Sequence, residues 1–223
     1  MSPRPFRLLL AGATGIVGRE VLQATLADNR IAQITALTRK PLPAHHKLEN
    51  IIADFSQLPA GARWWQVDAV ICTLGTTLQA AGSEAAFDMV DRDYPIAIAR
   101  QAHAAGATRY ALNSSLGASL AGNFYLRTKA EAEAGVRAAG YVSFTIVRPS
   151  IIDVDRTESR PGGAIGLAVA RLLRPSIPRR YRAVAPRHIA RALLDGVLSG
   201  HDGEHVTESE SLPPRKTFKN NQL

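Results

Sequence analysis

The sequence predicts an α/β fold, a doubly wound parallel sheet of the Rossmann type with a small C-terminal lobe on the substrate side. Three observations lead to this prediction. Short apolar segments alternate with helical ones through the first 150 residues, a glycine-rich turn joins the first strand to the first helix, and polar or glycine residues follow most strands. A chain of 223 residues fits one such domain, whose substrate lobe we expect at about residues 153–185.

The apolar pattern predicts strands and helices along the chain, and a proline falls inside one of the expected helices. Pro95 falls inside a long alanine-rich segment, where it marks an early turn or a kink of that helix. Residues 213–223 are polar and basic, and we expect a loose tail there. Strands are expected from Arg7 to the glycine turn and at 33–38, 50–55, 67–74, 108–112, 143–147 and 205–207, and helices after that turn and at about 84–106, 123–139, 164–173 and 187–198.

Composition excludes several classes of protein. The single cysteine, Cys72, cannot form an intrachain disulfide or a cysteine-built metal site, and we expect it to be buried in a strand. No apolar run reaches the ~18 residues needed to cross a membrane, and the N-terminal run is too short for a signal peptide. We therefore expect a cytoplasmic protein without a metal, present as a monomer or a homodimer.

Positive charge is concentrated in one part of the chain. The net charge is +8, and residues 159–194 contain eight arginines and no acid. This segment is either a solvated rim of the substrate lobe or a binding site for an anionic substrate group, an acidic partner or nucleic acid. We do not expect nucleic acid as a partner, because no aromatic stacking platform accompanies the arginines.

The glycine turn at residues 12–18 indicates a bound dinucleotide. Gly12 allows a tight turn after the strand, Gly15 lets the backbone approach a pyrophosphate, and Gly18 lets the helix pack close to the strand. The helix that follows offers unpaired N–H groups and the positive end of its dipole to the phosphates. Three glycines at this spacing are a weak signal alone, so the flanking strand and helix carry the prediction.

The end of the second strand indicates which dinucleotide binds. Arg39 and Lys40 stand about twenty residues beyond the turn, where an NAD-binding chain places an acid for the ribose 2′-hydroxyl. A guanidinium at this point can pair with a 2′-phosphate and stack on adenine, so NADP(H) is favoured over NAD(H). The alternative is a solvated basic pair at a strand exit.

Residues after the third and fourth strands extend the expected cofactor crevice, because ligands bind outside the carboxyl ends of parallel strands. Asp54 accepts a hydrogen bond from the adenine amino group beside the Phe55 ring, or else it caps the segment that starts at Ser56. Gly75 permits a backbone turn beneath a cofactor, and Thr76 supplies a small hydroxyl.

Three residues form a candidate reaction centre for carbonyl reduction. Ser115 follows the fifth strand, while Tyr125 and Lys129 lie one turn apart on the next helix. A tyrosine with the ordinary pKa of about 10 is a weak acid, so Lys129 would supply the positive charge that favours its phenolate. Tyr125 would then protonate the alkoxide formed by hydride transfer, and Ser115 would hold the substrate oxygen.

Taken together, these motifs resemble the atypical short-chain dehydrogenase/reductases, and within them the NADP-binding Tat-interacting-protein-like subgroup. The resemblance extends over about residues 6–210. It rests on the glycine spacing and on the segments Cys72–Thr77, Val90–Tyr94, Ser114–Ser115, Tyr125–Lys129 and Asp155–Gly162.

The resemblance implies a set of site residues. Ser115, Tyr125 and Lys129 would be the catalytic triad, and the chain departs from many larger family members at Asp91, where they carry an asparagine as a fourth catalytic residue. Residues 149–152 would border the nicotinamide. The cofactor-binding residues expected from the motifs and the resemblance are Gly12, Thr14, Gly15, Ile16, Val17, Arg39, Lys40, Asp54, Phe55, Thr73, Leu74, Gly75, Thr76, Ser114, Tyr125, Lys129, Pro149, Ser150, Ile151 and Ile152.

Two functions from different classes follow from these residues. The first is an NADPH-dependent oxidoreductase that reduces a small carbonyl or quinone-like substrate, with hydride from the nicotinamide and a proton from Tyr125. The second is a non-catalytic NADP(H)-binding protein that regulates or binds a partner, which Asp91 and the arginine-rich segment motivate. The substrate itself depends on how residues 153–185 fold, and loops of this length are poorly determined by local sequence.

Overall fold

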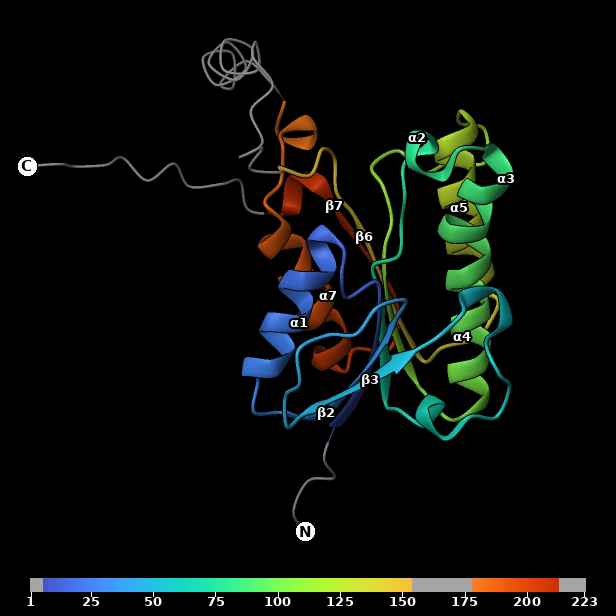
Figure 1. The fold of residues 1–223 in the computed structure, drawn as a ribbon. Coiled ribbons are helices and arrows are strands. Elements are labelled where there is room, and N and C mark those ends of the chain that lie inside the picture. Colours follow the sequence, from blue (N-terminus) through green and yellow to red (C-terminus); the bar gives the residue numbers. More distant parts are fainter. Residues whose placement is uncertain (1–5, 154–177, 213–223) are drawn as a thin grey trace, which may run out of the picture.

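Seven parallel strands form one sheet with helices on both faces in the computed structural model, which describes residues 6–153 and 178–212 (Figure 1). The strand order is β3-β2-β1-β4-β5-β6-β7. The chain therefore starts at the centre, runs outward to β3, and returns to place β4 on the other side of β1. This reversal is the switch point of a doubly wound sheet, so the predicted fold class is confirmed.

The strands and helices have the following bounds. The strands are β1 (Phe6–Ala11), β2 (Ile31–Thr38), β3 (Leu48–Ile52), β4 (Ala69–Cys72), β5 (Arg109–Asn113), β6 (Ser143–Arg148) and β7 (Gly203–Glu208). The helices are α1 (Ile16–Ala27), α2 (Leu78–Ala81), α3 (Glu84–Asp88), α4 (Tyr94–Ala104), α5 (Phe124–Arg137) and α7 (Pro186–Ser199).

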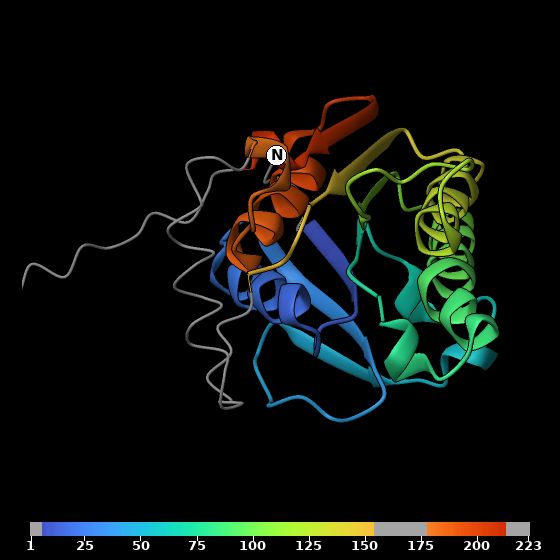
Figure 2. The same cartoon turned by 90° about the horizontal axis from the view of Figure 1, so that it is seen from above.

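Two hydrophobic cores lie on the two faces of the sheet. Figures 1 and 2 show α1 and α7 against one face and α4 and α5 against the other. In β1, Leu8 and Leu10 belong to the first core, whereas Leu9 and Ala11 belong to the second. This alternation explains why the whole strand is apolar, since a parallel strand is covered on both sides. Cys72 is buried in β4 as predicted, and burial raises the pKa of its thiol.

Several predicted boundaries are wrong around the third strand. β3 ends at Ile52 rather than at residue 55, because Asp54 turns the chain into a short 3₁₀ helix, Phe55–Gln57. Strands and helices also do not alternate throughout: a loop joins β2 to β3, and short 3₁₀ helices lie between β3 and β4. The helix expected at 164–173 and the tail at 213–223 lie outside the described residues.

The helix expected at 84–106 consists of α3, a π-helical turn at Met89–Asp93, and α4. Pro95 explains the π turn, because it lacks the N–H that would bond to the carbonyl of Asp91 and its ring crowds that carbonyl. The backbone N–H of Tyr94 instead donates to the carbonyl of Met89, five residues earlier. Such insertions change the direction of the residues beside them, and here Asp91 is buried.

Candidate functional site

The glycine turn closes tightly against the end of β4. A Cβ atom on Gly12 would lie 2.7 Å from the Thr73 Oγ1 atom, and one on Gly18 would overlap the Gly12 carbonyl oxygen. The Thr73 hydroxyl donates to the carbonyl of Ala11 at 3.1 Å. Gly12 also has φ +90°, a backbone angle that side chains disfavour. Both glycines are therefore required by close contacts in the protein itself, and Thr73 acts by holding the turn.

The start of α1 is exposed and has no side-chain cap. Gly15 occupies the N-cap position without a side-chain hydrogen bond, and the first turn contains no acid. Thr14, Gly15 and Ile16 are exposed, while the Val17 side chain is buried. The N–H of Gly15 donates to the Gly12 carbonyl at 3.0 Å. The groups that remain to meet an anion are backbone N–H groups of the next residues, the kind of donor that phosphate-binding turns use.

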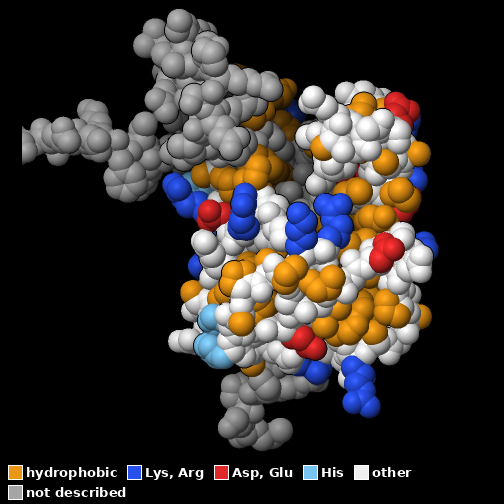
Figure 3. Space-filling view, viewed as in Figure 1, with side chains coloured by type: hydrophobic (Ala, Val, Ile, Leu, Met, Phe, Trp, Pro, Cys, Tyr) orange, Lys and Arg blue, Asp and Glu red, His pale blue; other side chains and the backbone are white. Residues whose placement is uncertain are grey.

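The exit of β2 presents two exposed cations. Arg39 and Lys40 follow the strand directly, and within residues 6–153 and 178–212 no carboxylate pairs with Arg39. The Thr38 hydroxyl fixes this exit, since it donates to the Lys40 carbonyl and accepts from the Asn50 side chain, both at 2.7 Å. Figure 3 shows a row of Lys and Arg side chains across one face of the molecule.

Asp54 caps the 3₁₀ helix after β3, as one of the two interpretations of this residue predicted. Its Oδ1 atom accepts from the backbone N–H and the hydroxyl of Ser56, at 2.9 and 2.7 Å, and these bonds lower the pKa of the carboxyl. Phe55 is only 9% exposed, and its ring packs 5.7 Å from that of Tyr94. The adenine contact of Asp54 stays a prediction, and the Phe55 ring presents little surface to it.

A buried ion pair lies beneath the turn after β4. The Lys129 Nζ atom is 2.6 Å from Asp91 Oδ1, and the two side chains are 8% and 1% exposed. The other oxygen, Asp91 Oδ2, accepts from the backbone N–H of Thr76 at 2.8 Å. A Cβ atom on Gly75 would lie 3.4 Å from Asp91 Oδ1 and 3.7 Å from Lys129 Nζ. The turn therefore rests directly on the ion pair.

Tyr125 is the exposed member of the predicted pair of Tyr125, the proton donor, and Lys129, the cation beside it. It lies in the first turn of α5, which Asn123 caps by accepting from the N–H of Leu126 at 3.0 Å. Tyr125 is 41% exposed, and its ring centroid lies 6.0 Å from Lys129 Nζ and 5.7 Å from the Phe87 ring. The spacing of four residues thus brings the phenol and the ammonium side by side.

Ser114 and Ser115 have different surroundings. The buried Ser114 hydroxyl donates to Glu133 at 2.5 Å, and Glu133 pairs with Arg148 at 2.6 Å, which raises the pKa of that guanidinium. The Ser114 hydroxyl is therefore engaged within the protein. Ser115 follows in a loop whose Ser119 N–H donates to the carbonyl of Leu126 at 3.2 Å, so the loop is bonded to α5 beside Tyr125.

The segment expected to border the nicotinamide follows β6. Ser150 donates through its N–H to the Ser209 hydroxyl at 3.1 Å and through its own hydroxyl to the carbonyl of Arg182 at 2.6 Å. Ile152 pairs with Val184, and Ile151 is 68% exposed. Residues 149–153 and 182–184 therefore run together at the carboxyl end of the sheet. Most of the expected lobe, residues 154–177, lies outside the described residues.

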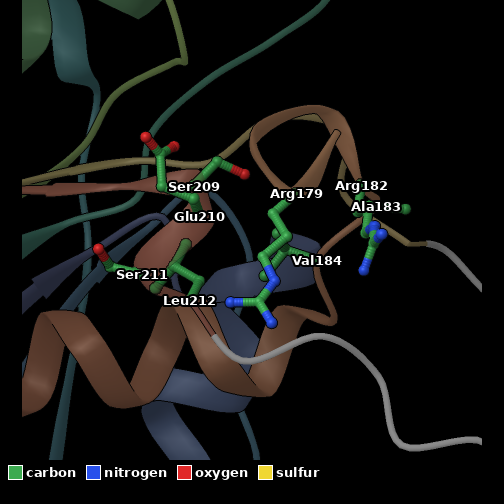
Figure 4. A pocket seen from close by; sticks show the side chains of 8 residues that line it. All are labelled: Arg179, Arg182, Ala183, Val184, Ser209, Glu210, Ser211 and Leu212. Carbon is green, nitrogen blue, oxygen red and sulfur yellow. The ribbon is translucent and has the colours of Figure 1, made fainter. Parts of the chain in front are cut away.

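A small pocket of about 230 Å³ adjoins this segment. Arg179 reaches toward Leu212 from one side, and Ser209 and Glu210 lie on the other (Figure 4). The described end of the arginine-rich segment therefore lies beside residues 149–152, though Glu210 offsets part of its charge. The lining residues are Arg179, Arg182, Ala183, Val184, Ser209, Glu210, Ser211 and Leu212.

Sequence reasoning gave no role to Asn113, the last residue of β5. Its Oδ1 atom is buried and has no hydrogen-bond partner among the described residues. A buried acceptor without a partner is costly, so Asn113 is a candidate for accepting a hydrogen bond from a ligand or a water molecule. Its position directly before Ser114, at the end of a strand, was the available signal.

Among the described residues, no group of His, Cys, Asp and Glu side chains has the arrangement of a metal site.

Residues 12–181 match a protein-family model described as NAD(P)H-binding. The chain belongs to this family. Rat protein HTATIP2 is 32% identical over 206 residues, which cover 88% of this chain and 83% of that protein. A protein of Aspergillus fumigatus named fmp52, mitochondrial, is 32% identical over 220 residues, or 91% of this chain and 92% of its own. The predicted family resemblance is confirmed.

Solved structures with low sequence identity share the fold. MoeE5 in complex with UDP-glucose and NAD superposes with a TM-score of 0.66 at 17% identity, over 90% of this chain and 74% of that one. The PhqB reductase domain from Penicillium fellutanum gives a TM-score of 0.62 at 20% identity, over 90% and 66%. These similarities show a shared fold, and the match to the NAD(P)H-binding family is what supports a nicotinamide cofactor. None of the described helices combines the length and the apolar character that a membrane crossing requires.

Proposed function

We propose that this protein is an NADPH-dependent reductase of a small carbonyl or quinone-like substrate. The observation that carries the proposal is the placement of Tyr125 and Lys129 on one face of α5, with Lys129 beneath the turn after β4. That turn stands beside the glycine turn at the switch point of the sheet, where dinucleotides bind in this fold. A proton donor and a cation are thus available next to the expected nicotinamide.

Different parts of the chain bind different parts of the cofactor. The start of α1 takes the pyrophosphate through backbone N–H groups, and Arg39 takes the 2′-phosphate at the exit of β2. Residues 149–152 border the nicotinamide half. When bound, NADPH supplies a hydride to the carbonyl carbon of the substrate.

Proton transfer completes the reduction. As the hydride adds to the carbon, the electrons of the C=O double bond move to the oxygen, which takes the hydroxyl proton of Tyr125. The Lys129 ammonium stabilises the phenolate that remains, and solvent restores its proton. The Ser115 hydroxyl donates a hydrogen bond to the same oxygen and orients it. Such positioned acid catalysis contributes about 10²–10⁴-fold to the rate.

A substrate screen with two tyrosine variants tests this proposal. Carbonyl and quinone compounds are offered with NADPH, and its oxidation is followed by absorbance. Tyr125→Phe should lower kcat by about 10²–10⁴-fold, because the proton donor is removed. Tyr141→Phe is the matched control, since that hydroxyl donates to the carbonyl of Ala99, outside the crevice. Equal turnover by Tyr125→Phe and the parent would refute the role of Tyr125.

Cofactor choice is tested separately by calorimetry with NADPH and NADH. Arg39→Ala should weaken NADPH binding by about tenfold or more and leave NADH binding unchanged, because charged hydrogen bonds contribute about 1.5–3 kcal/mol. Arg30→Ala is the matched control: it removes an equal charge from the opposite end of β2, where Arg30 pairs with Asp28. If NADH binds the parent as tightly as NADPH, the preference for NADP(H) is wrong.

A second candidate function is a non-catalytic NADP(H)-binding protein that regulates or binds a partner. The observation that favours it is the ion pair of Lys129, whose charge is already compensated by Asp91. This function predicts cofactor binding without turnover and a partner whose recovery in pull-downs depends on NADPH. Identical pull-downs with and without NADPH count against it.

Location in the cell is a further part of the proposal. We expect a cytoplasmic protein, whereas the similar A. fumigatus protein is named mitochondrial. Fractionation of cells that carry the tagged protein decides between the two compartments.

A further inference from the structure

Asp91 makes two contacts that the proposed reaction does not use. One oxygen of its carboxylate meets the Lys129 ammonium at 2.6 Å, and the other accepts from the N–H of Thr76 at 2.8 Å. Lys129 belongs to α5 and Thr76 to the turn after β4. Asp91 therefore joins α5, which carries Tyr125 and Lys129, to a turn that is expected to touch the cofactor.

The neighbouring acids pair with another cation, so the Asp91 carboxylate is the one that pairs with Lys129. The neighbouring acids Asp88, Asp93 and Glu131 all pair with Arg92, at 2.8–3.0 Å, on the more exposed side of the helix. A buried carboxylate is costly unless its charge is compensated, and here Oδ2 accepts from an N–H group while Oδ1 lies 2.6 Å from a cation but has no hydrogen-bond partner among the described residues. Such a buried pair often gives no net stability over apolar residues, so stability alone does not account for it.

The backbone gives Asp91 this position through the π turn. Residues 89–93 are wound as a π turn ahead of Pro95, and the Asp91 side chain is 1% exposed. The turn after β4 passes close to this side chain, since a Cβ atom on Gly75 would lie 3.4 Å from the carboxylate, an ordinary contact distance. Turn, carboxylate and ammonium are thus in direct contact, and a shift of one displaces the others.

We propose that Asp91 is a positioning residue that couples occupation of the Gly75–Thr76 turn by the cofactor to the placement of the Lys129 ammonium. The inference rests on the proposed function, because it assigns Lys129 to the reaction site. An asparagine at position 91 keeps an acceptor for the Thr76 N–H but has no charge for Lys129, and an alanine keeps neither. The two substitutions therefore separate the two halves of the coupling.

The test uses the full chain with the variants Asp91→Asn and Asp91→Ala. Asp88→Asn is the matched control, since Asp88 lies on the adjoining helix and accepts from Thr128 of α5 without touching the turn. NADPH affinity is measured by calorimetry, and the rate of Lys129 acylation by mass spectrometry. Neither measurement needs turnover. The pH profile of kcat is added once a substrate is found.

The two variants have different expected results. Asp91→Ala should weaken NADPH binding by about tenfold, and Asp91→Asn by less than about threefold, because it retains the acceptor. Both should acylate Lys129 at least about tenfold faster, since the ammonium loses the partner that holds it. In Asp91→Asn the alkaline limb of kcat should move to lower pH by about one unit, because the compensating carboxylate is gone.

Support requires both the loss of affinity in Asp91→Ala and the faster acylation in either variant, with Asp88→Asn unchanged in both. Parent-like affinity in Asp91→Ala, or parent-like acylation in both variants, overturns the coupling. If Asp91→Ala does not fold, the acylation rate in the isosteric Asp91→Asn decides. A parent protein that reduces no substrate while these two readouts change refutes the proposed function and leaves the coupling in place.

Discussion

Single atoms decide the geometry of the cofactor turn. Gly18 has no room for a methyl group against the Gly12 carbonyl, and Gly12 has none against Thr73. The glycines that a dinucleotide motif requires are thus explained by contacts within the protein, before any ligand is considered. The same contacts allow the α1 N-terminus to stand directly above β1 and offer its N–H groups to a pyrophosphate.

Replacing Gly18 by alanine should therefore disrupt the turn. Gly18→Ala is expected to lower the free energy of unfolding by about 3 kcal/mol, because backbone cannot move aside as a flexible side chain does. Urea denaturation measures the loss, and calorimetry should find NADPH binding weakened as well. Gly61→Ala is the matched control: it has φ +72° and no neighbours, so conformational strain alone should cost about 1 kcal/mol. Equal losses in the two variants would contradict the contact argument.

Asp28 gives the chain a measurable sensitivity to acid. It accepts hydrogen bonds from the Arg30 guanidinium, which lower the pKa of its carboxyl to about 2 from 3.8. A carboxyl whose pKa is depressed on folding stabilises the fold above its unfolded value, and that stabilisation disappears as the pH falls from about 4 to about 2.

Asp28→Asn should consequently flatten the acid limb of stability. The free energy of unfolding, measured by urea denaturation from pH 5 to pH 2, should fall less steeply in this variant than in the parent. Asp202→Asn, on the exposed turn before β7, is the control that should keep the parent slope. Parallel slopes for Asp28→Asn and the parent would show that Asp28 does not contribute.

At the scale of elements, the break between α3 and α4 is the informative feature. A regular helix through residues 84–104 would turn Asp91 away from its present direction, because the π turn adds one residue to the winding. Pro95 causes the break, and Asp91 meets Lys129 as a result. A helix defect thus places the side chain of the proposed positioning residue.

Pro95→Ala should let the π turn relax toward a regular helix. The new N–H can donate to the Asp91 carbonyl, and the carboxylate would then be displaced from Lys129 and Thr76. We expect kcat/KM for the substrate found in the screen to fall by roughly 10²-fold, since small misplacements of catalytic groups have effects of this size. Pro43→Ala, on an exposed loop, is the matched control. A parent-like kcat/KM in Pro95→Ala would show that the π turn does not position the site.

At the scale of the whole molecule, all proposed contacts with the cofactor lie at the carboxyl edge of the sheet. Under the proposed function, the ends of β1, β2 and β3 would serve the adenosine half of the cofactor, and the ends of β4, β5 and β6 would serve the nicotinamide half. The two halves of the sheet share the central pair of β1 and β4. A ligand across this edge should therefore stabilise the molecule as a unit.

Binding should appear as thermal stabilisation. At a concentration of 100 times its Kd, NADPH adds about 2.7 kcal/mol and should raise the Tm by roughly 5–10 °C for a chain of this length. Calorimetric scans with NADPH, with NADH and without cofactor measure the shift. NADH at the same concentration should give a smaller rise in the parent protein. Equal rises with NADH and NADPH would contradict the role of Arg39.

The strands with apolar patterns were predicted closely, and the irregular connections were not. β1, β5 and β6 lie where the apolar runs placed them, because burial on both faces leaves a continuous signal. β3 ended early because a capping aspartate competes with strand pairing, a balance that local sequence does not reveal. The π turn depends on one missing N–H group, which pattern alone reports only as a kink near Pro95.

The sequence by itself determined the fold class, the dinucleotide turn, the cations after β2, and the pairing of Tyr125 with Lys129 at helical spacing. These follow from local rules: glycine where backbone approaches backbone, apolar residues where both faces are buried, and one face for residues four apart. Only the tertiary structure decided that Ser114 binds Glu133, that Asn113 has an unmatched acceptor, and that Asp91 joins Lys129 to Thr76. Those contacts link residues 15 to 38 positions apart, and their geometry is set by how the layers pack rather than by any local pattern.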